Sequence, residues 1–181
     1  MNYLQYYHIP YTGLKLGQHI FEYEIDKRFF DEFEYSIVKD GKLELVVTLD
    51  KQETLIIANF DIKGFIYLDC DLCLSSFPAE TTINERVIIK FSEHEDISED
   101  TEEILILSKR DHELDISPLI YEYINLAAPF NSRCDDPGNK STCDVEMINK
   151  INDLSVHNKE SEQQNIDPRW EILNKIKKNN K

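Results

Sequence analysis

Residues 42–69 read KLELVVTLDKQETLIIANFDIKGFIYLD, and this stretch decides the fold. In its first part, apolar and polar side chains alternate along the chain. The apolar positions there are Leu43, Leu45, Val47 and Leu49. The second part, from Thr54 to Asp69, is rich in Ile, Phe, Tyr and Leu. Alternation with a period of two residues is typical of a strand with one buried face. Two such runs joined by a short polar segment predict a long β-hairpin.

Further strands are expected on both sides of this hairpin. His19–Ile25 places apolar residues between polar ones before it, and Thr81–Phe91 does so after it. The short apolar run Ile104–Leu107 is also expected to form a strand. Asp26–Phe33 interrupts the strands with a short helix, for which Asp26 is the expected N-cap. We therefore expect an α+β fold, with an antiparallel, curved β-sheet or open β-barrel-like domain and a few packed helices.

A clear helix follows the strands. Ser117 is expected to cap its free amides, and Pro118 at the first helical position costs no hydrogen bond. Apolar residues then recur at helical spacing. They are Leu119, Ile120, Tyr123, Ile124 and Ala127. Pro129 ends the helix, and the spacing of apolar residues between Met147 and Leu154 predicts another short one.

The chain divides into a body, a linker and a basic tail. Residues 1–154 are expected to form a single α+β domain, residues 155–166 a polar linker, and residues 167–181 a C-terminal amphipathic helix. This helix carries a net charge of +3, against −18 for the rest of the chain. The residues predicted to contact RNA or a protein partner are Arg169, Trp170, Lys175, Lys177 and Lys178. The alternative is an ordinary amphipathic helix that covers the sheet and ends in lysines favoured by the helix dipole.

The overall charge restricts the kinds of partner. The chain has 20 basic and 35 acidic residues, a formal net charge of −15. Non-specific nucleic-acid binding depends on Lys and Arg displacing counterions, so direct RNA contact needs a local basic patch. A basic protein, by contrast, would be attracted by the acidic body.

The composition also predicts the location and argues against catalysis. No stretch approaches the roughly 18–20 apolar residues of a membrane span, and residues 1–17 lack the features of a signal peptide. We expect a cytoplasmic protein with no membrane partner. The chain has only five glycines and no P-loop, GxGxxG motif or nucleophile elbow. We therefore expect no enzyme and no small-molecule substrate.

Four cysteines form a candidate metal site. Cys70 and Cys73 are separated by two residues, which lets both thiolates face one zinc ion. Cys134 and Cys143 are further apart and flank a loop containing Pro137. The hypothesis is one structural zinc ion held by all four. Two alternatives stay open, namely thiols without a metal and a redox-active CxxC pair, although the βαβ context usual for such a pair is missing.

Two segments resemble a known family. Leu68–Leu74 (LDCDLCL), followed by a strand, resembles the C-x-R-C-L element of the YceD family, with Leu72 where many members have Arg. Asp115–Pro129 resembles that family's second element, a short acidic lead-in, a capped helix containing Glu and an L-x-x-P exit. The ending Asp167–Trp170, with Leu173 and Lys177, is similar to that of Bacteroidetes-type members. The chain lacks the distal C-G-L-C-x-x-C-G of many bacterial members.

This resemblance implies a function in ribosome biogenesis. It implies support of 23S rRNA accumulation and large-subunit assembly, without known catalysis. The partner would be a large-subunit precursor, its rRNA or a basic ribosomal protein. The alternative is a zinc-stabilised protein-interaction module whose partner lies outside the ribosome.

Overall fold

The structure, a computed structural model, describes residues 3–92, 104–108 and 110–155. The chain divides into two compact units, Met1–Asp144 and Val145–Lys181. The first unit holds every strand of the described residues and the four cysteines. The second unit, as far as it is described, is helix α3 (Val145–Leu154), which confirms the helix predicted there. The predicted linker from residue 156 onward and the helix 167–181 lie outside the described residues.

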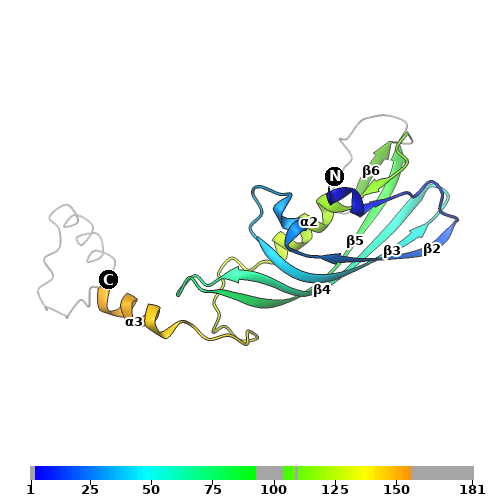
Figure 1. Cartoon of the computed structure of the whole chain (residues 1–181). Helices are drawn as coiled ribbons and strands as arrows, with labels where there is room; N and C mark the ends of the chain where they lie inside the picture. Colours follow the sequence, from blue (N-terminus) through cyan, green and yellow to red (C-terminus); the bar gives the residue numbers. More distant parts are fainter. Residues whose placement is uncertain (1–2, 93–103, 109, 156–181) are drawn as a thin grey trace, which may run out of the picture. The chain divides into compact units, whose positions relative to one another are not determined.

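The first unit is built on one curved, mostly antiparallel sheet of five strands in sequential order (Figure 1). The strands are β2 (Gly17–Ile25), β3 (Asp40–Lys51), β4 (Leu55–Asp69), β5 (Ser76–Ser92) and β6 (Ile104–Ser108). The predicted hairpin is the β3–β4 pair, in which Leu45 lies opposite Ile62 and Val47 opposite Phe60. Strand β6 runs parallel to β5, which the sequence did not indicate. The sheet has β2 and β6 as its edges and does not close into a barrel.

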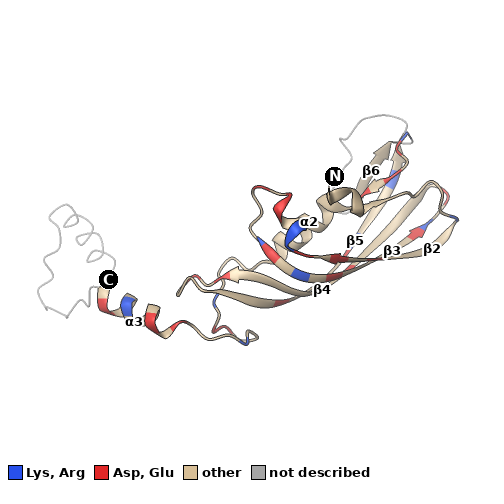
Figure 2. Cartoon of the chain, viewed as in Figure 1, with Lys and Arg blue, Asp and Glu red and all other residues tan. Residues whose placement is uncertain are grey.

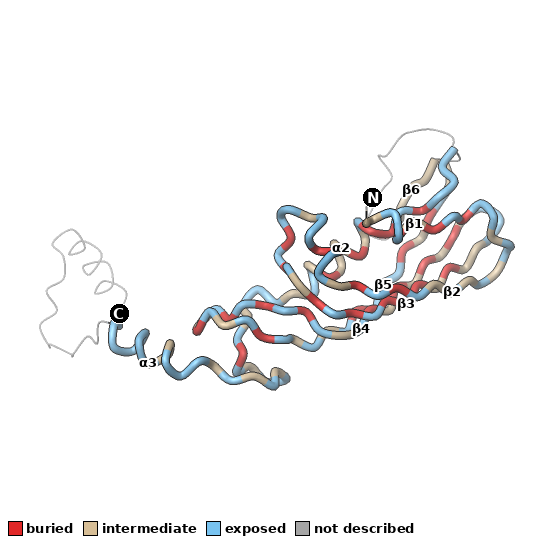
Figure 3. The backbone as a smooth tube through the Cα atoms, viewed as in Figure 1, coloured by how far each residue is buried: buried red, intermediate tan, exposed pale blue. Residues whose placement is uncertain are grey.

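The core lies on one face of this sheet. Figure 3 shows buried and exposed positions alternating along the strands. The four apolar positions predicted on β3, from Leu43 to Leu49, are all at most 1% exposed. Helix α1 (Lys27–Asp31), helix α2 (Ser117–Ala127) and the 3-10 helix η1 (Tyr3–Tyr7) add buried side chains to the core. Tyr123 of α2 contacts the ring of Phe60 at 5.4 Å between centroids.

The two helix starts behave differently from each other. Asp26 caps α1 as predicted, because its carboxylate accepts a hydrogen bond from the Arg28 amide at 3.0 Å. The prediction that Ser117 caps α2 is wrong. Its amide and its hydroxyl both donate to Asp115 Oδ1, at 2.9 and 2.6 Å. A carboxylate is a stronger acceptor than a hydroxyl and also suits the positive end of the helix. Proline lies in the first turn, as predicted.

A second, two-stranded sheet joins the start of the chain to the entry of α2. Strand β1 (His8–Ile9) pairs antiparallel with β7 (Leu114–Asp115). Strands of two residues carry no periodic signal, and the sequence analysis did not predict them. Figure 2 shows acidic residues both on the large sheet and on α3. Within the described part of the chain, no helix is long and apolar enough to cross a membrane.

Candidate metal centre

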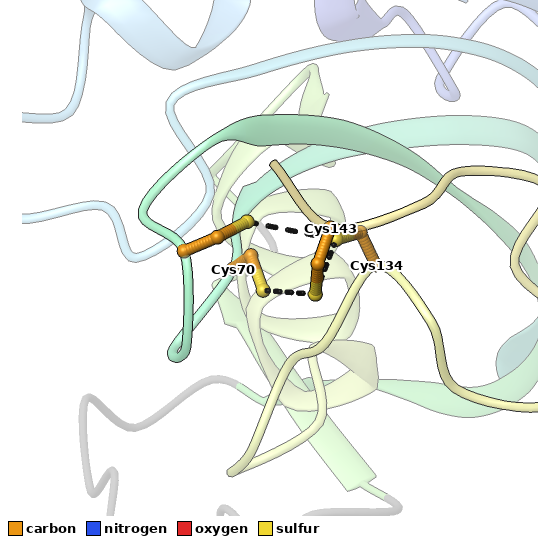
Figure 4. Close-up of side chains that lie close together, drawn as sticks. Cys70, Cys134 and Cys143 are labelled. Atoms are coloured by element: carbon orange, nitrogen blue, oxygen red, sulfur yellow. Dashed lines mark hydrogen bonds between the residues drawn. The ribbon is translucent and has the colours of Figure 1, made fainter. Parts of the chain in front are cut away.

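The four cysteines converge at one end of the β4–β5 hairpin. Cys70 directly follows β4 and Cys73 lies in the turn before β5, whereas Cys134 and Cys143 come from the segment after α2. Three of the sulfurs are labelled in Figure 4, where they point toward one another. Cys70, Cys73 and Cys134 are buried, and Cys143 is half-buried. Residues more than 60 positions apart in the sequence thus form one cluster, as the zinc hypothesis requires.

The distances between the sulfur atoms match those of a tetrahedral site. All four Sγ atoms lie within 4.8 Å of one another. The Sγ atoms of Cys70 and Cys143 are 3.9 Å apart, those of Cys73 and Cys134 3.7 Å, and those of Cys134 and Cys143 3.2 Å. Four thiolates at about 2.3 Å from a central zinc ion would be separated by roughly 3.8 Å. The cluster is therefore compatible with one metal ion of tetrahedral preference.

Backbone hydrogen bonds shape the turn that carries the first pair. The Cys70 amide donates to Ser75 O at 3.0 Å, and the Leu74 amide donates to Cys70 O at 2.9 Å. These bonds fold the turn so tightly that Leu74 adopts φ 60°, in the left-handed region. That conformation is uncommon for any residue with a side chain as large as leucine. The turn thus holds Cys70 and Cys73 on the same side.

The second pair is tied to the first by a reciprocal bond. The Asp71 amide donates to Ser132 O at 2.8 Å, and the Ser132 amide donates to the Asp71 carboxylate at 2.6 Å. Asn139 Nδ2 donates to Arg133 O at 2.7 Å and so closes the loop that leads back to Cys143. This loop geometry compensates for the wide spacing of the second cysteine pair.

The electrostatic environment favours thiolates at the first pair. Amides of Asp144 and Ser75 donate to the Cys73 sulfur and lower its pKa to about 6. At Cys70, burial opposes ionisation, but amide hydrogen bonds outweigh it and the pKa lies below its usual value. Burial raises the pKa of Cys134, and the hydrogen bond with Cys134 raises that of Cys143. The pKa shifts of the four thiols thus run in opposite directions, as expected when neighbouring like charges compete.

The other predicted site residues, Arg169, Trp170, Lys175, Lys177 and Lys178, lie outside the described residues. Leu74 and the exposed residues around the metal centre were not identified from the sequence. A left-handed leucine gives no signal in a single sequence, because glycine or asparagine would be expected there.

The comparison with known proteins identifies the family of the chain. The family model described as "Large ribosomal RNA subunit accumulation protein YceD" matches residues 58–177, which include all four cysteines and α2. The chain belongs to the YceD family. The family description connects it with the ribosome in broad terms.

One curated protein is similar to a part of the chain. The "Uncharacterized protein YlbN" of Bacillus subtilis (strain 168) is 28% identical over 120 residues, 66% of this YceD chain and 65% of the relative. The chain therefore spans just under two thirds of the length of the curated relative it matches. No solved structure matches.

Proposed function

We propose that this chain is a non-enzymatic ribosome biogenesis factor. It supports 23S rRNA accumulation and large-subunit assembly in the cytoplasm, by binding a precursor particle or a basic ribosomal protein. The observation that carries the proposal is the YceD family match over residues 58–177. The net charge of −15 supports a basic partner, because the electrostatic field of an acidic protein attracts a basic protein before the two come into contact.

Sedimentation of native cell lysate tests this function. The chain is expected to migrate with precursors of the large subunit, and its loss is expected to lower 23S rRNA relative to 16S rRNA. Migration only at the top of the gradient, with unchanged rRNA, would contradict the proposal. A pull-down dominated by non-ribosomal proteins would instead favour the interaction module with a partner outside the ribosome.

We further propose that Cys70, Cys73, Cys134 and Cys143 hold one structural zinc ion. The sulfur distances and the lowered pKa of Cys73 support this ligand set. Elemental analysis of protein purified without chelator should give about one zinc per chain. The matched variant is Cys134→Ser, which should lower that ratio strongly. A ratio far below one in the wild type would rule the ion out.

The basic segment from residue 167 onward is proposed to take part in docking, through Arg169, Trp170, Lys175, Lys177 and Lys178. Its positive charge in an otherwise acidic chain supports this assignment. Truncation after Asn165 should leave the stability of the body unchanged and remove association with the precursor. If the truncated protein unfolds instead, the segment belongs to the folded core.

A further inference from the structure

A hollow of mixed polar and apolar lining lies beside the cysteine cluster. Its apolar side chains include Ile37, Tyr67 and Phe130, and its volume is about 390 Å³. The side chains are unusually exposed for their size: Phe130 is 99% exposed, Ile37 73% and Tyr67 42%. Single exposed apolar residues are common on protein surfaces, but a hollow lined by several marks an interaction site.

The backbone that carries these side chains is ordered by hydrogen bonds and strand pairing. Asn125 Oδ1 of α2 accepts hydrogen bonds from the Ile37 and Val38 amides, at 2.8 and 3.2 Å. Tyr67 lies within β4 and pairs with Asp40 of β3. Phe130 stands two residues before Ser132, whose bonds to Asp71 were described above. A partner that covers apolar groups on an ordered backbone has less backbone entropy to remove than one that covers an unstructured segment.

Leu74 provides a second, independent observation. It lies in the turn between Asp71 and Ser76, two residues that line the hollow, although Leu74 itself is not one of the lining residues. Its backbone has φ 60°, and its side chain is 71% exposed. Glycine would adopt this conformation without strain, so leucine here is unfavourable for the isolated protein. Strained residues of this kind concentrate at binding sites, where the side chain contributes contacts that glycine cannot make.

The charged groups around the hollow are mainly acidic. Asp40, Asp69 and Asp71 lie on its rim, with Lys39 as the basic residue among those that line it. The Lys39 ammonium donates to Glu34 O, and the Asp40 and Asp71 carboxylates accept from the Gly41 and Ser132 amides. These bonds leave the charges in place, so the carboxylates outnumber the ammonium group around the hollow. Exposed apolar side chains among carboxylates complement a segment that presents an apolar anchor between Lys or Arg residues.

We infer that this surface, which we call the anchor site (Ile37, Tyr67, Leu74 and Phe130, with Asp40, Asp69 and Asp71), docks a basic amphipathic protein segment. The inference deepens the proposed function, on which it rests for the source of the partner, a basic protein of the large subunit. RNA fits less well, because the rim carboxylates repel phosphates. A second copy of this chain would place acidic rim against acidic rim.

The test uses photo-cross-linking on the full chain. A benzophenone amino acid replaces Phe130, and the protein is mixed with RNA-free total protein from purified large subunits and, separately, with 23S rRNA. Cross-links are expected to a ribosomal protein, through a peptide with Lys or Arg beside an apolar residue. The matched control carries the same cross-linker at Ile20, which is 65% exposed on β2, and should capture nothing comparable.

Two variants test the anchor side chains themselves. Phe130→Ala and Leu74→Gly should each weaken binding of the captured protein by at least roughly tenfold. Leu74→Gly should keep its zinc content and stability, because glycine relieves the left-handed backbone. Asp69→Lys should weaken binding at low salt more than at high salt, since exposed charges are screened.

Several outcomes would overturn the inference. These are cross-links to rRNA or to a second copy of the chain, no captured ribosomal protein, or unchanged affinity in both variants. Its failure is distinguishable from failure of the proposed function. If wild type and Phe130→Ala both sediment with precursors, the anchor site is wrong and the function stands. If neither does, although the wild type binds a ribosomal protein in vitro, the function is wrong.

Discussion

At the scale of single residues, the backbone conformation at Gly64 restricts which residue the position accepts. Gly64 of β4 has φ 149°, and a Cβ added there would lie 2.2 Å from Lys42 O of the neighbouring strand. The clash cannot be relieved by a side-chain rotation, because the clashing atom belongs to the backbone of β3. This position in the central hairpin therefore requires glycine.

Gly64→Ala should accordingly destabilise the protein by about 2–4 kcal/mol, the range for a substitution at a strained position with a close backbone contact. Urea unfolding measures the change. The control is Gly13→Ala, because a Cβ at Gly13 meets nothing within 4 Å. Equal stability of the two variants would show that β3 and β4 are less closely apposed than described.

Asp26 predicts a pH dependence of stability. The hydrogen bonds of Arg28, the shortest at 2.6 Å, hold the pKa of the Asp26 carboxyl below its usual value. Because the pKa is lower in the folded state, the stabilisation is complete above the unfolded pKa of about 3.9 and is lost as the pH falls through the folded pKa. Asp26→Asn can still cap α1 but has no charge.

Urea unfolding of both proteins between pH 7 and pH 3 checks this prediction. The variant should be less stable at pH 7, and the difference should shrink as the pH falls. The effect should be smaller than that of Gly64→Ala, because the pair is largely exposed and screened by solvent. A constant difference at every pH would mean that the charge of Asp26 contributes nothing.

At the scale of elements, Asn125 connects α2 to the loop before β3. Its side chain accepts from the amides of Ile37 and Val38 and donates to Tyr121 O at 2.7 Å. A single amide group therefore fixes the loop that carries part of the anchor site. A backbone amide left without a hydrogen-bond acceptor lowers the free energy of unfolding wherever water cannot take the place of that acceptor.

Asn125→Ala should lower the free energy of unfolding by about 1–3 kcal/mol, the cost of leaving such donors unsatisfied. Hydrogen exchange should accelerate at residues 36–38 in particular. Asn131→Ala, at an exposed position after α2, is the matched control and should change neither quantity. Unchanged exchange in the Asn125 variant would mean that packing alone orders the loop.

At the scale of the whole molecule, the first unit has two separate sources of stability. Among the described residues, the sheet has a continuous apolar core, and the cysteine cluster lies at one end of it. The cysteine cluster, in contrast, ties the β4–β5 turn to the segment after α2. We therefore expect removal of the proposed zinc ion to open one end of the unit without unfolding the sheet, because local regions can open independently of the core.

A chelator should accelerate hydrogen exchange in residues 70–75 and 129–144 and leave β3 and the middle of β4 protected. Cys134→Ser should reproduce this pattern without chelator. Loss of protection throughout the sheet would contradict the expectation that the cysteine cluster and the sheet are stabilised independently. It would mean that metal binding is required for the whole fold, as in small zinc domains.

Much of this structure follows from local sequence pattern. The alternation of Leu43, Leu45, Val47 and Leu49 determined the central hairpin, because side chains on a strand point to opposite faces at successive residues. Asp26 and the apolar stripe of α2 were also predictable, since caps and helical periodicity depend on neighbours in the chain. The CxxC spacing identified Cys70 and Cys73 as half of the candidate metal centre, because these two residues are neighbours in the chain.

The remaining features depended on contacts between residues distant in sequence. Three features are decided only when the sheet and α2 pack together. They are the parallel pairing of β6 with β5, the approach of Cys134 and Cys143 to Cys70 and Cys73, and the anchor site. Periodicity describes which way a side chain faces, but not which distant segment it meets. The sequence by itself therefore determined the sheet and the candidate cysteines, whereas the tertiary structure decided how the four sulfurs cluster and which surface lies beside them.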